Sequence, residues 1–160
     1  MSGFSKIGLG VMATELDDNQ KRALDEMRRI YTETVVDHAL HPRNFGNLPD
    51  ADGFASITTD GGDTIKMWLR VKNDQIVEAF FWTDACAVTI ASLSMTTELI
   101  KGKTVTEALV ISQQDVLEAL GGLPEGNVHC ALQAVGVLRE ALKDYNTIKK
   151  EPWKKTYRQY

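Results

Sequence analysis

The sequence predicts an α+β domain in which a small antiparallel β-sheet of about three strands is packed by several α-helices. Strand patterns are confined to residues 54–83, and helical patterns lie on both sides of them. Segregated runs of strands and helices are typical of the α+β class. The chain has 160 residues, of which 43% are hydrophobic and 25% are charged. These values suit one domain with its own core and argue against disorder.

Residues 17–40 are expected to form the first helix. Their apolar side chains recur close to a period of 3.6 residues, at Leu24, Met27, Ile30, Tyr31, Val35 and Val36. Asp17 or Asp18 could cap the start of this helix. His41-Pro42 should end it, because proline disfavours helix in the residue before it. The loop that follows places glycine, proline and asparagine at turn positions.

The strand pattern is clearest at residues 65–72. Apolar and mostly polar positions alternate there, with Ile65, Met67, Leu69 and Val71 set against Lys66, Trp68, Arg70 and Lys72. This alternation predicts a strand with one buried face. Asn73-Asp74 is then a tight turn, and residues 76–83 form the returning strand because they are rich in β-branched and aromatic side chains. Residues 54–59 can add a third strand.

Helices are expected again after the strands. Residues 88–101 should form one, with Gly102 as its C-cap, and residues 104–111 and 112–120 should form two shorter ones. Gly121-Gly122-Leu123-Pro124 breaks the chain. Asn127 could cap a last helix whose buried face carries Ala131, Val135, Leu138 and Leu142.

The domain is predicted to span residues 17–148. Residues 1–16 are expected to be a flexible arm, and residues 149–160 a basic, aromatic tail that ends in solvent. The net charge of −4 argues against nucleic-acid binding. The longest uncharged apolar run, 85–97, is too short to span a bilayer, so no membrane association is expected. Two cysteines do not make a disulfide framework, which favours the reducing cytoplasm.

Two cysteines at helix starts are the main candidates for chemistry. Cys86 precedes a helix and Cys130 begins another, where backbone N–H groups and the helix dipole favour the thiolate. His129 offers an imidazole ligand, and Asp63 follows two glycines. Structural interpretations stay open, because a lone cysteine can be a small core residue and Gly-Gly-Asp can be a plain turn. Cys86 and Cys130 are forty-four positions apart, and the chain has no Cys-x-x-Cys pair.

Four segments in order resemble the IscU/NifU N-terminal family of iron–sulfur cluster assembly scaffolds. They are YTETVVDHALHPRNFGNL (31–48), GDTIKMWLRV (62–71), CAVTIASLSMTTELIKGK (86–103) and LPEGNVHCALQAV (123–135). The resemblance covers about residues 31–145 and implies the fold predicted above. It also implies a non-enzymatic scaffold that accepts sulfur from a cysteine desulfurase, binds iron or a [2Fe–2S] cluster, and passes it to acceptor proteins. Zinc is an alternative occupant of such a site.

The resemblance assigns the metal ligands residue by residue. It implies Asp63, Cys86, His129 and Cys130 as the ligand set, with Cys130 as the sulfur acceptor, and it places the family's first cysteine at Gly61. The remaining O, S, N and S donors suit tetrahedral zinc and suit a cluster less well, because carboxylate and imidazole are harder donors than thiolate. A cluster held here should therefore be more labile than one held by three cysteines.

Two departures from the family pattern bear on function. The IscU branch carries Leu-Pro-Pro-Val-Lys before its His-Cys, and this chain has LPEGN at 123–127, so hand-off to a dedicated Hsp70-type chaperone by that segment is not expected. The chain is interpreted as a single-domain NifU-like variant. The missing thiol at Gly61 keeps an alternative open, in which a degenerate zinc-binding homologue docks on a partner and regulates it. A hydrolase using Asp63 and His129 is disfavoured, because no nucleophile elbow or phosphate loop accompanies them.

Overall fold

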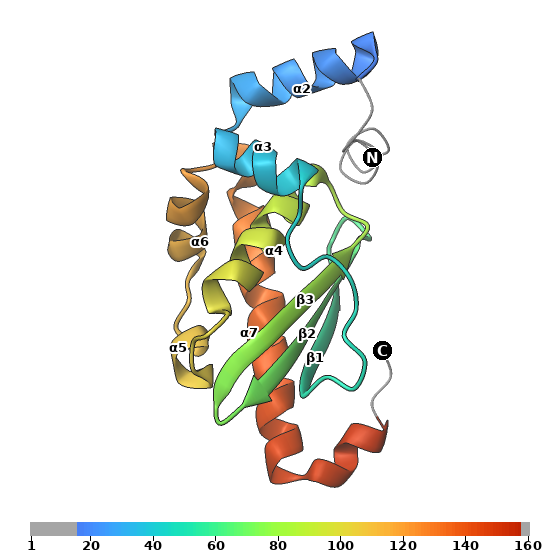
Figure 1. Cartoon of the computed structure of the whole chain (residues 1–160), viewed down its shortest axis with the longest axis vertical. Helices are drawn as coiled ribbons and strands as arrows, with labels where there is room; N and C mark the ends of the chain where they lie inside the picture. Colours follow the sequence, from blue (N-terminus) through green and yellow to red (C-terminus); the bar gives the residue numbers. More distant parts are fainter. Residues whose placement is uncertain (1–15, 158–160) are drawn as a thin grey trace.

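The computed structural model describes residues 16–157 and shows, in that range, a three-stranded antiparallel sheet with six α-helices and two short 3₁₀ helices (Figure 1). The strands β1 (Gly53–Thr58), β2 (Thr64–Lys72) and β3 (Gln75–Thr83) are ordered β1-β2-β3. The helices are α2 (Asp18–Ile30), α3 (Glu33–Leu40), α4 (Ala87–Ile100), α5 (Val105–Leu109), α6 (Gln113–Leu120) and α7 (Val128–Lys150), with η1 (Glu125–Asn127) and η2 (Pro152–Tyr157). The predicted α+β class is confirmed. The predicted arm, apart from Leu16, lies outside the described residues.

The prediction of one helix over residues 17–40 is wrong, because the chain breaks between α2 and α3. Tyr31 is extended at φ −115° and ψ 156°, and Thr32 caps α3 by accepting a hydrogen bond from the N–H of Val35. The Thr32 hydroxyl also donates to the carbonyl of Leu120 at the end of α6. Ile30 is 59% exposed, so it does not belong to the predicted buried face. The apolar residues keep a helical period across the break, so the period did not reveal that Thr32 caps a second helix.

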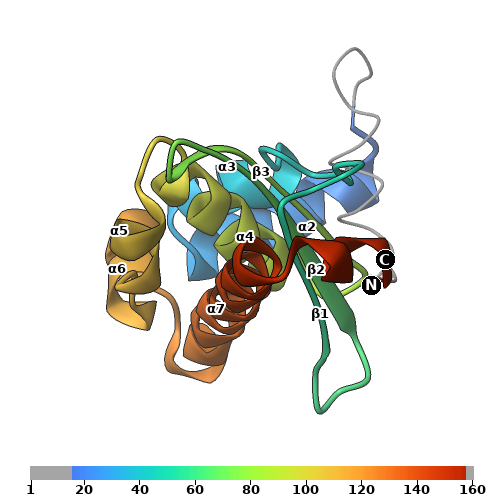
Figure 2. The same ribbon diagram turned by 90° about the horizontal axis from the view of Figure 1, so that it is seen from below.

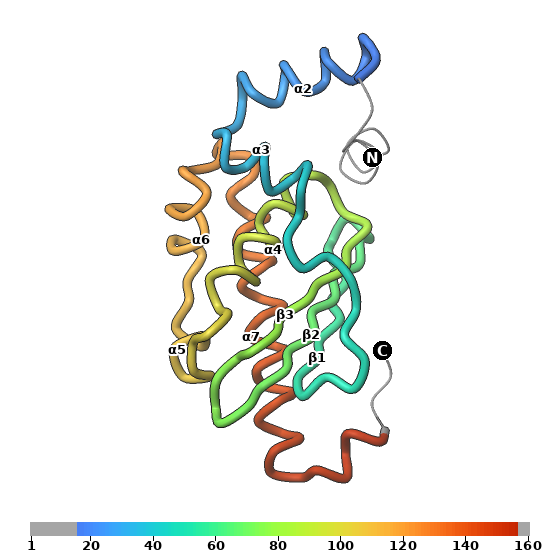
Figure 3. Tube along the Cα trace, viewed as in Figure 1, coloured from blue at the N-terminus to red at the C-terminus, as the bar shows by residue number. Residues whose placement is uncertain are grey.

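Both faces of the sheet are covered, although the sequence predicted one buried face. Ile65, Met67 and Leu69 are fully buried on the face that α4 and α7 cover, with α4 against β3 and α7 against β1 and β2 (Figure 2). Residues 41–52 pass over the opposite face (Figure 3). There Trp68 is only 5% exposed and belongs to a second apolar cluster with Leu48, Ala51, Phe54 and Phe80.

The predicted turns and the later helices are confirmed. Asn73 and Asp74 both have positive φ, at 52° and 63°, as a tight two-residue hairpin turn requires. Gly102 follows α4 with φ 81°, and Gly121 and Gly122 end α6 with φ 81° and 98°. The four residues expected on the buried face of the last helix are all at most 1% exposed: Ala131, Val135, Leu138 and Leu142.

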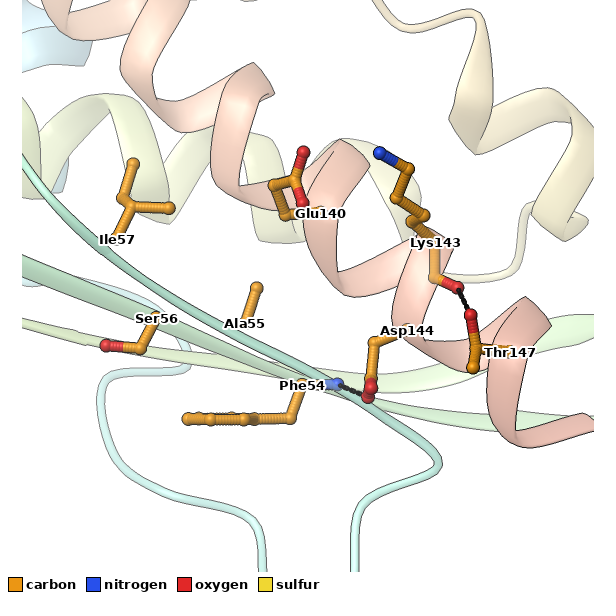
Figure 4. Close-up of a pocket in the computed structure, with 8 residues that line it drawn as sticks. All are labelled: Phe54, Ala55, Ser56, Ile57, Glu140, Lys143, Asp144 and Thr147. Atoms are coloured by element: carbon orange, nitrogen blue, oxygen red, sulfur yellow. Dashed lines mark hydrogen bonds between the residues drawn. The ribbon is translucent and has the colours of Figure 1, made fainter. Parts of the chain in front are cut away.

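The helix α7 lies directly against β1, and Gly53 permits this close approach. An ideal Cβ at Gly53 would stand 2.7 Å from the carbonyl oxygen of Ala141 and 3.1 Å from the Cβ of Tyr145. One residue further on, the N–H of Phe54 donates to the carboxylate of Asp144 at 2.9 Å (Figure 4). Figure 4 shows that Ala55 and Ile57 point toward α7, whereas Phe54 points away from it. The backbone of β1 is thus fixed on α7 at its first residues.

We expect Gly53→Ala to lower the free energy of unfolding by about 1–3 kcal/mol, because the added methyl group would meet α7 backbone that cannot rotate away. Gly136→Ala is the matched control within α7. An ideal Cβ at Gly136 meets nothing within 4 Å, and alanine in place of a helical glycine should stabilise by about 1 kcal/mol. Urea unfolding measures whether the free energy of unfolding falls in Gly53→Ala and rises in Gly136→Ala. Equal stability of Gly53→Ala and the parent would show that α7 is free to shift.

The segment Asp37–Asn44, which is part of the first family-like sequence segment, is anchored to α4. The buried ring of His38 is hydrogen-bonded through Nδ1 to the Ser94 hydroxyl at 2.7 Å, and the N–H of Arg43 donates to the same oxygen at 2.9 Å. The Arg43 guanidinium also pairs with Asp37 at 2.6 Å. Burial, and then the Arg43 charge, lower the pKa of His38. These contacts therefore hold in place the loop that crosses the sheet.

The chain after α7 folds back toward the loop before β1. Lys149 and Lys150, the first two residues of the expected tail, are the last residues of α7, and η2 follows. The Lys155 ammonium lies 3.3 Å from the Asp50 carboxylate and 3.7 Å from that of Asp52. Within residues 16–157, none of the helices combines the length and apolar composition that a bilayer crossing requires.

Candidate functional site

Three connections of the chain meet at the upper end of the sheet in Figure 1. They are the turn between β1 and β2, the link from β3 to α4, and the start of α7. Together they line a cavity of about 450 Å³ whose walls include Gly61, Asp63, Cys86, Thr89 and His129. The antiparallel topology therefore brings residues from three distant parts of the sequence to one place.

The turn that holds Asp63 is closed by its own hydrogen bonds. The N–H of Thr59 donates to the carbonyl of Asp63 at 2.8 Å, and the N–H of Gly62 donates to the carbonyl of Thr59 at 2.9 Å. The N–H of Asp63 donates to the Thr59 hydroxyl at 3.2 Å. Gly62 has φ 88°, a conformation that favours glycine. The Gly-Gly-Asp segment is thus a turn in its backbone, and its carboxylate borders the cavity.

Both thiols contact the side chain of Thr89. The Thr89 hydroxyl is 3.5 Å from the sulfur of Cys86 and 3.5 Å from the sulfur of Cys130. Cys86 is exposed, whereas Cys130 is only 1% exposed. Cys86 occupies the N-cap of α4, but its side chain makes no cap hydrogen bond. Cys130 is the third residue of α7. Both cysteines therefore sit at helix starts, as predicted.

The pKa values of the two thiols shift in opposite directions. A hydrogen bond from the Cys130 thiol, aided by the hydroxyl and amide of Thr89 and the amide of Val88, lowers the pKa of Cys86 to about 5 against the opposing effect of burial. The hydrogen bond to Cys86, followed by burial, raises the pKa of Cys130. The thiol that loses its proton first is the one that water can reach, because hydration stabilises the charge. In the metal-free protein, Cys86 is therefore the exposed thiolate.

His129 stands beside the buried thiol. Its Nε2 lies 3.7 Å from the sulfur of Cys130, and its exposed ring lines the cavity with Cys86 and Asp63. The structure thus brings Cys86, His129 and Cys130 together and places Asp63 on the same cavity. Even so, among residues 16–157 no three His, Cys, Asp or Glu side chains already surround a point where a metal ion would sit. A metal ion shared by these four side chains would require their rotation.

Sequence reasoning missed two polar residues at this site. Thr89 carries a signal that could have been used, because it lies one helical turn after Cys86 and so shares its face. Tyr31 gave no such signal. Its hydroxyl donates to Asn127 Oδ1 at 3.3 Å, and Asn127, at the N-cap position of α7, makes no cap hydrogen bond. Burial, and then electrostatic repulsion from the two nearby cysteines, Cys86 before Cys130, raise the pKa of Tyr31.

Comparison with known proteins gives one family and several relatives. The family described as "NifU-like N terminal domain" matches residues 30–152. The "Iron-sulfur cluster assembly scaffold protein IscU 1" of Archaeoglobus fulgidus is 44% identical over 117 residues, which cover 72% of this chain and 76% of that protein. The "Iron-sulfur cluster assembly scaffold protein IscU" of Aquifex aeolicus is 41% identical over 118 residues, covering 72% and 75%.

A solved structure has the same fold. The crystal structure of the N-terminal part of a nitrogen-fixing NifU-like protein from Brucella abortus superposes with a TM-score of 0.59. The match covers 76% of this chain and 97% of that one at 18% identity. This likeness confirms the predicted fold class and adds no information about the chemistry of the site.

Proposed function

The chain belongs to the NifU-like N-terminal domain family, and we propose that it is an iron–sulfur cluster assembly scaffold that binds its cargo at Asp63, Cys86, His129 and Cys130. The observation that carries this proposal is that two thiols, which both contact Thr89, and one imidazole lie beside a cavity that Asp63 also lines. Thiolate sulfur is the preferred donor for iron–sulfur clusters, and histidine replaces it in some of them. Iron and the [2Fe–2S] cluster are the cargo of this scaffold.

Each donor has a separate part in this proposal. Cys86 supplies an exposed thiolate, so it can meet incoming iron without prior deprotonation. His129 lies beside the buried thiol and lines the cavity, so its ring is available as a nitrogen donor. Asp63 contributes an oxygen from a turn whose backbone is already closed. Binding of metal releases the proton that the two thiols share, because only thiolates act as ligands.

We propose Cys130 as the sulfur acceptor, as the family resemblance implies. The step transfers a sulfane sulfur from the desulfurase persulfide to the Cys130 thiolate, which forms a Cys130 persulfide and regenerates the desulfurase thiolate. An external electron donor then reduces that sulfur to sulfide when iron is present. Because Cys130 is only 1% exposed, docking of the desulfurase has to uncover it.

The partners in this proposal are a cysteine desulfurase and proteins that accept the cluster. The desulfurase performs the bond-breaking chemistry, so the scaffold itself has no enzymatic turnover. The reducing cytoplasm suits these steps, because both cysteines have to remain unpaired thiols. The segment 123–127 lacks the second proline and the lysine of the chaperone-binding pattern, and the proposal therefore includes no Hsp70-type chaperone.

Metal and sulfide analysis tests the function directly. The protein is purified without oxygen, assayed for iron, zinc and acid-labile sulfide, and assayed again after incubation with a cysteine desulfurase, ferrous iron, cysteine and a reductant. We expect equal amounts of iron and sulfide, with charge-transfer absorption in the visible spectrum. A sample without the desulfurase is the control. Absence of sulfide after complete incubation would contradict the scaffold function.

A second candidate function rests on the missing thiol at Gly61. In this alternative the chain holds zinc at the same four residues and regulates a partner without assembling clusters. The mixed O, N and S donor set favours it, because zinc accepts such ligands in tetrahedral geometry. Zinc that stays bound through the same incubation, with no gain of iron, would identify this function.

A further inference from the structure

The buried hydroxyl of Thr89 makes different contacts from three other hydroxyls of α4. Ser92, Thr96 and Thr97 donate to carbonyl groups three or four residues earlier in the helix, at 2.7–2.9 Å. Thr89 stands in the first turn, and its hydroxyl contacts the sulfur atoms of Cys86 and Cys130 instead. Its side chain is 3% exposed and lies on the wall of the cavity. A buried hydroxyl that contacts two thiols can form a hydrogen bond with either sulfur.

We propose that Thr89 is a positioning residue for the cargo, whose hydroxyl donates a hydrogen bond to the Cys130 sulfur, contacts the Cys86 sulfur and so keeps the two side chains together. This inference rests on the proposed function and deepens it by adding a residue outside the ligand set. Thr89 acts through Cys86 and Cys130 and is not itself a ligand.

The role is largest when metal is bound, because both sulfurs coordinate metal as thiolates, which accept hydrogen bonds and cannot donate them. The Thr89 hydroxyl lies 3.5 Å from each sulfur and can donate to these thiolates. Hydrogen bonds to ligand sulfur tune the stability and the reduction potential of a bound centre.

Three variants separate positioning from simple packing. Thr89→Val keeps the shape of the side chain and removes the donor, whereas Thr89→Ser keeps the donor and removes a methyl group. Thr96→Val is the matched control, because Thr96 is fully buried in the same helix and its hydroxyl donates to the Ser92 carbonyl, away from the thiols. All three are compared with the parent by thermal unfolding of the metal-free protein.

The measurement is titration of the metal-free protein with cobalt(II), followed by the sulfur-to-cobalt charge-transfer band. We expect Thr89→Val to weaken cobalt binding about three- to tenfold, the range for loss of one hydrogen bond, and to shift the band. Thr89→Ser should restore both properties, and Thr96→Val should leave both at parent values. In the cluster-loaded protein, Thr89→Val should lower the reduction potential.

The outcomes distinguish this inference from the proposed function. If the parent binds cobalt through thiolates but Thr89→Val has the same affinity and the same band, the positioning role is overturned and the scaffold function stands. Equal losses in Thr89→Val and Thr96→Val would assign the effect to stability and would also overturn it. If the parent shows no cobalt–thiolate band and gains no sulfide, the proposed function itself fails.

Discussion

Gly61→Cys is expected to slow the loss of a bound cluster to a chelator by about tenfold or more. The resemblance places the family's first cysteine at this position, and the structure accommodates a side chain there. An ideal Cβ at Gly61 would lie 3.7 Å from Asp63 Oδ2 and 3.8 Å from the Thr59 hydroxyl, which are ordinary contacts. Gly61 also lines the cavity. A third thiolate would then join Cys86 and Cys130, and thiolate is the donor that clusters prefer.

The size of the effect follows from the donor that is added. Removing even an indirect partner of a metal ligand typically changes affinity by about 10- to 100-fold, so adding a ligand should change it at least as much. The measurement is the decay of visible absorption after addition of a chelator. Gly61→Ser is the control, because it adds a side chain of similar shape without a thiolate. Equal decay of the Cys and Ser variants would show that this wall of the cavity does not face the cluster.

Much of the fold could be predicted because its signals are local. The alternation of Ile65, Met67 and Leu69, the tight turn at Asn73-Asp74 and the face that carries Leu138 each depend on neighbours within a few residues. The burial of Trp68 was not predictable in this way. It depends on residues 41–52 crossing the sheet, which a strand's own alternation cannot reveal. The break at Tyr31 was hidden for a similar reason, since Thr32 is fixed partly by the distant carbonyl of Leu120.

The sequence indicated which residues could form the candidate site, but it did not indicate how they are arranged in space. Helix starts at Cys86 and Cys130 could be expected from the sequence, but their contact across forty-four positions follows from the way α4 and α7 pack side by side on the sheet. The unequal burial of the two thiols also depends on that packing. Resemblance alone assigned sulfur acceptance to Cys130, and only the structure shows that this thiol is covered in the free protein.

The two cysteines should therefore show opposite selectivity toward a small reagent and toward the desulfurase. In the metal-free protein, brief treatment with iodoacetamide at pH 6.5 should modify Cys86 at least about tenfold faster than Cys130, because the thiolate is the nucleophile and Cys130 is buried with a raised pKa. The pKa of Cys86 is lowered to about 5. Its reactivity should thus persist above that pH and be lost as the pH falls below it. Peptide mass spectrometry measures both sites.

With the desulfurase and cysteine present, the persulfide should instead form on Cys130. Cys130→Ser should abolish persulfide labelling, and Cys86→Ser should retain it, because in the proposed function the docked desulfurase uncovers the buried thiol and Cys86 serves as a metal ligand. Circular dichroism of both variants checks that the fold survives. A persulfide found on Cys86 in the Cys130→Ser protein would transfer the acceptor role to the exposed thiolate. In that case the burial of Cys130 would protect a ligand and would not control the arrival of sulfur.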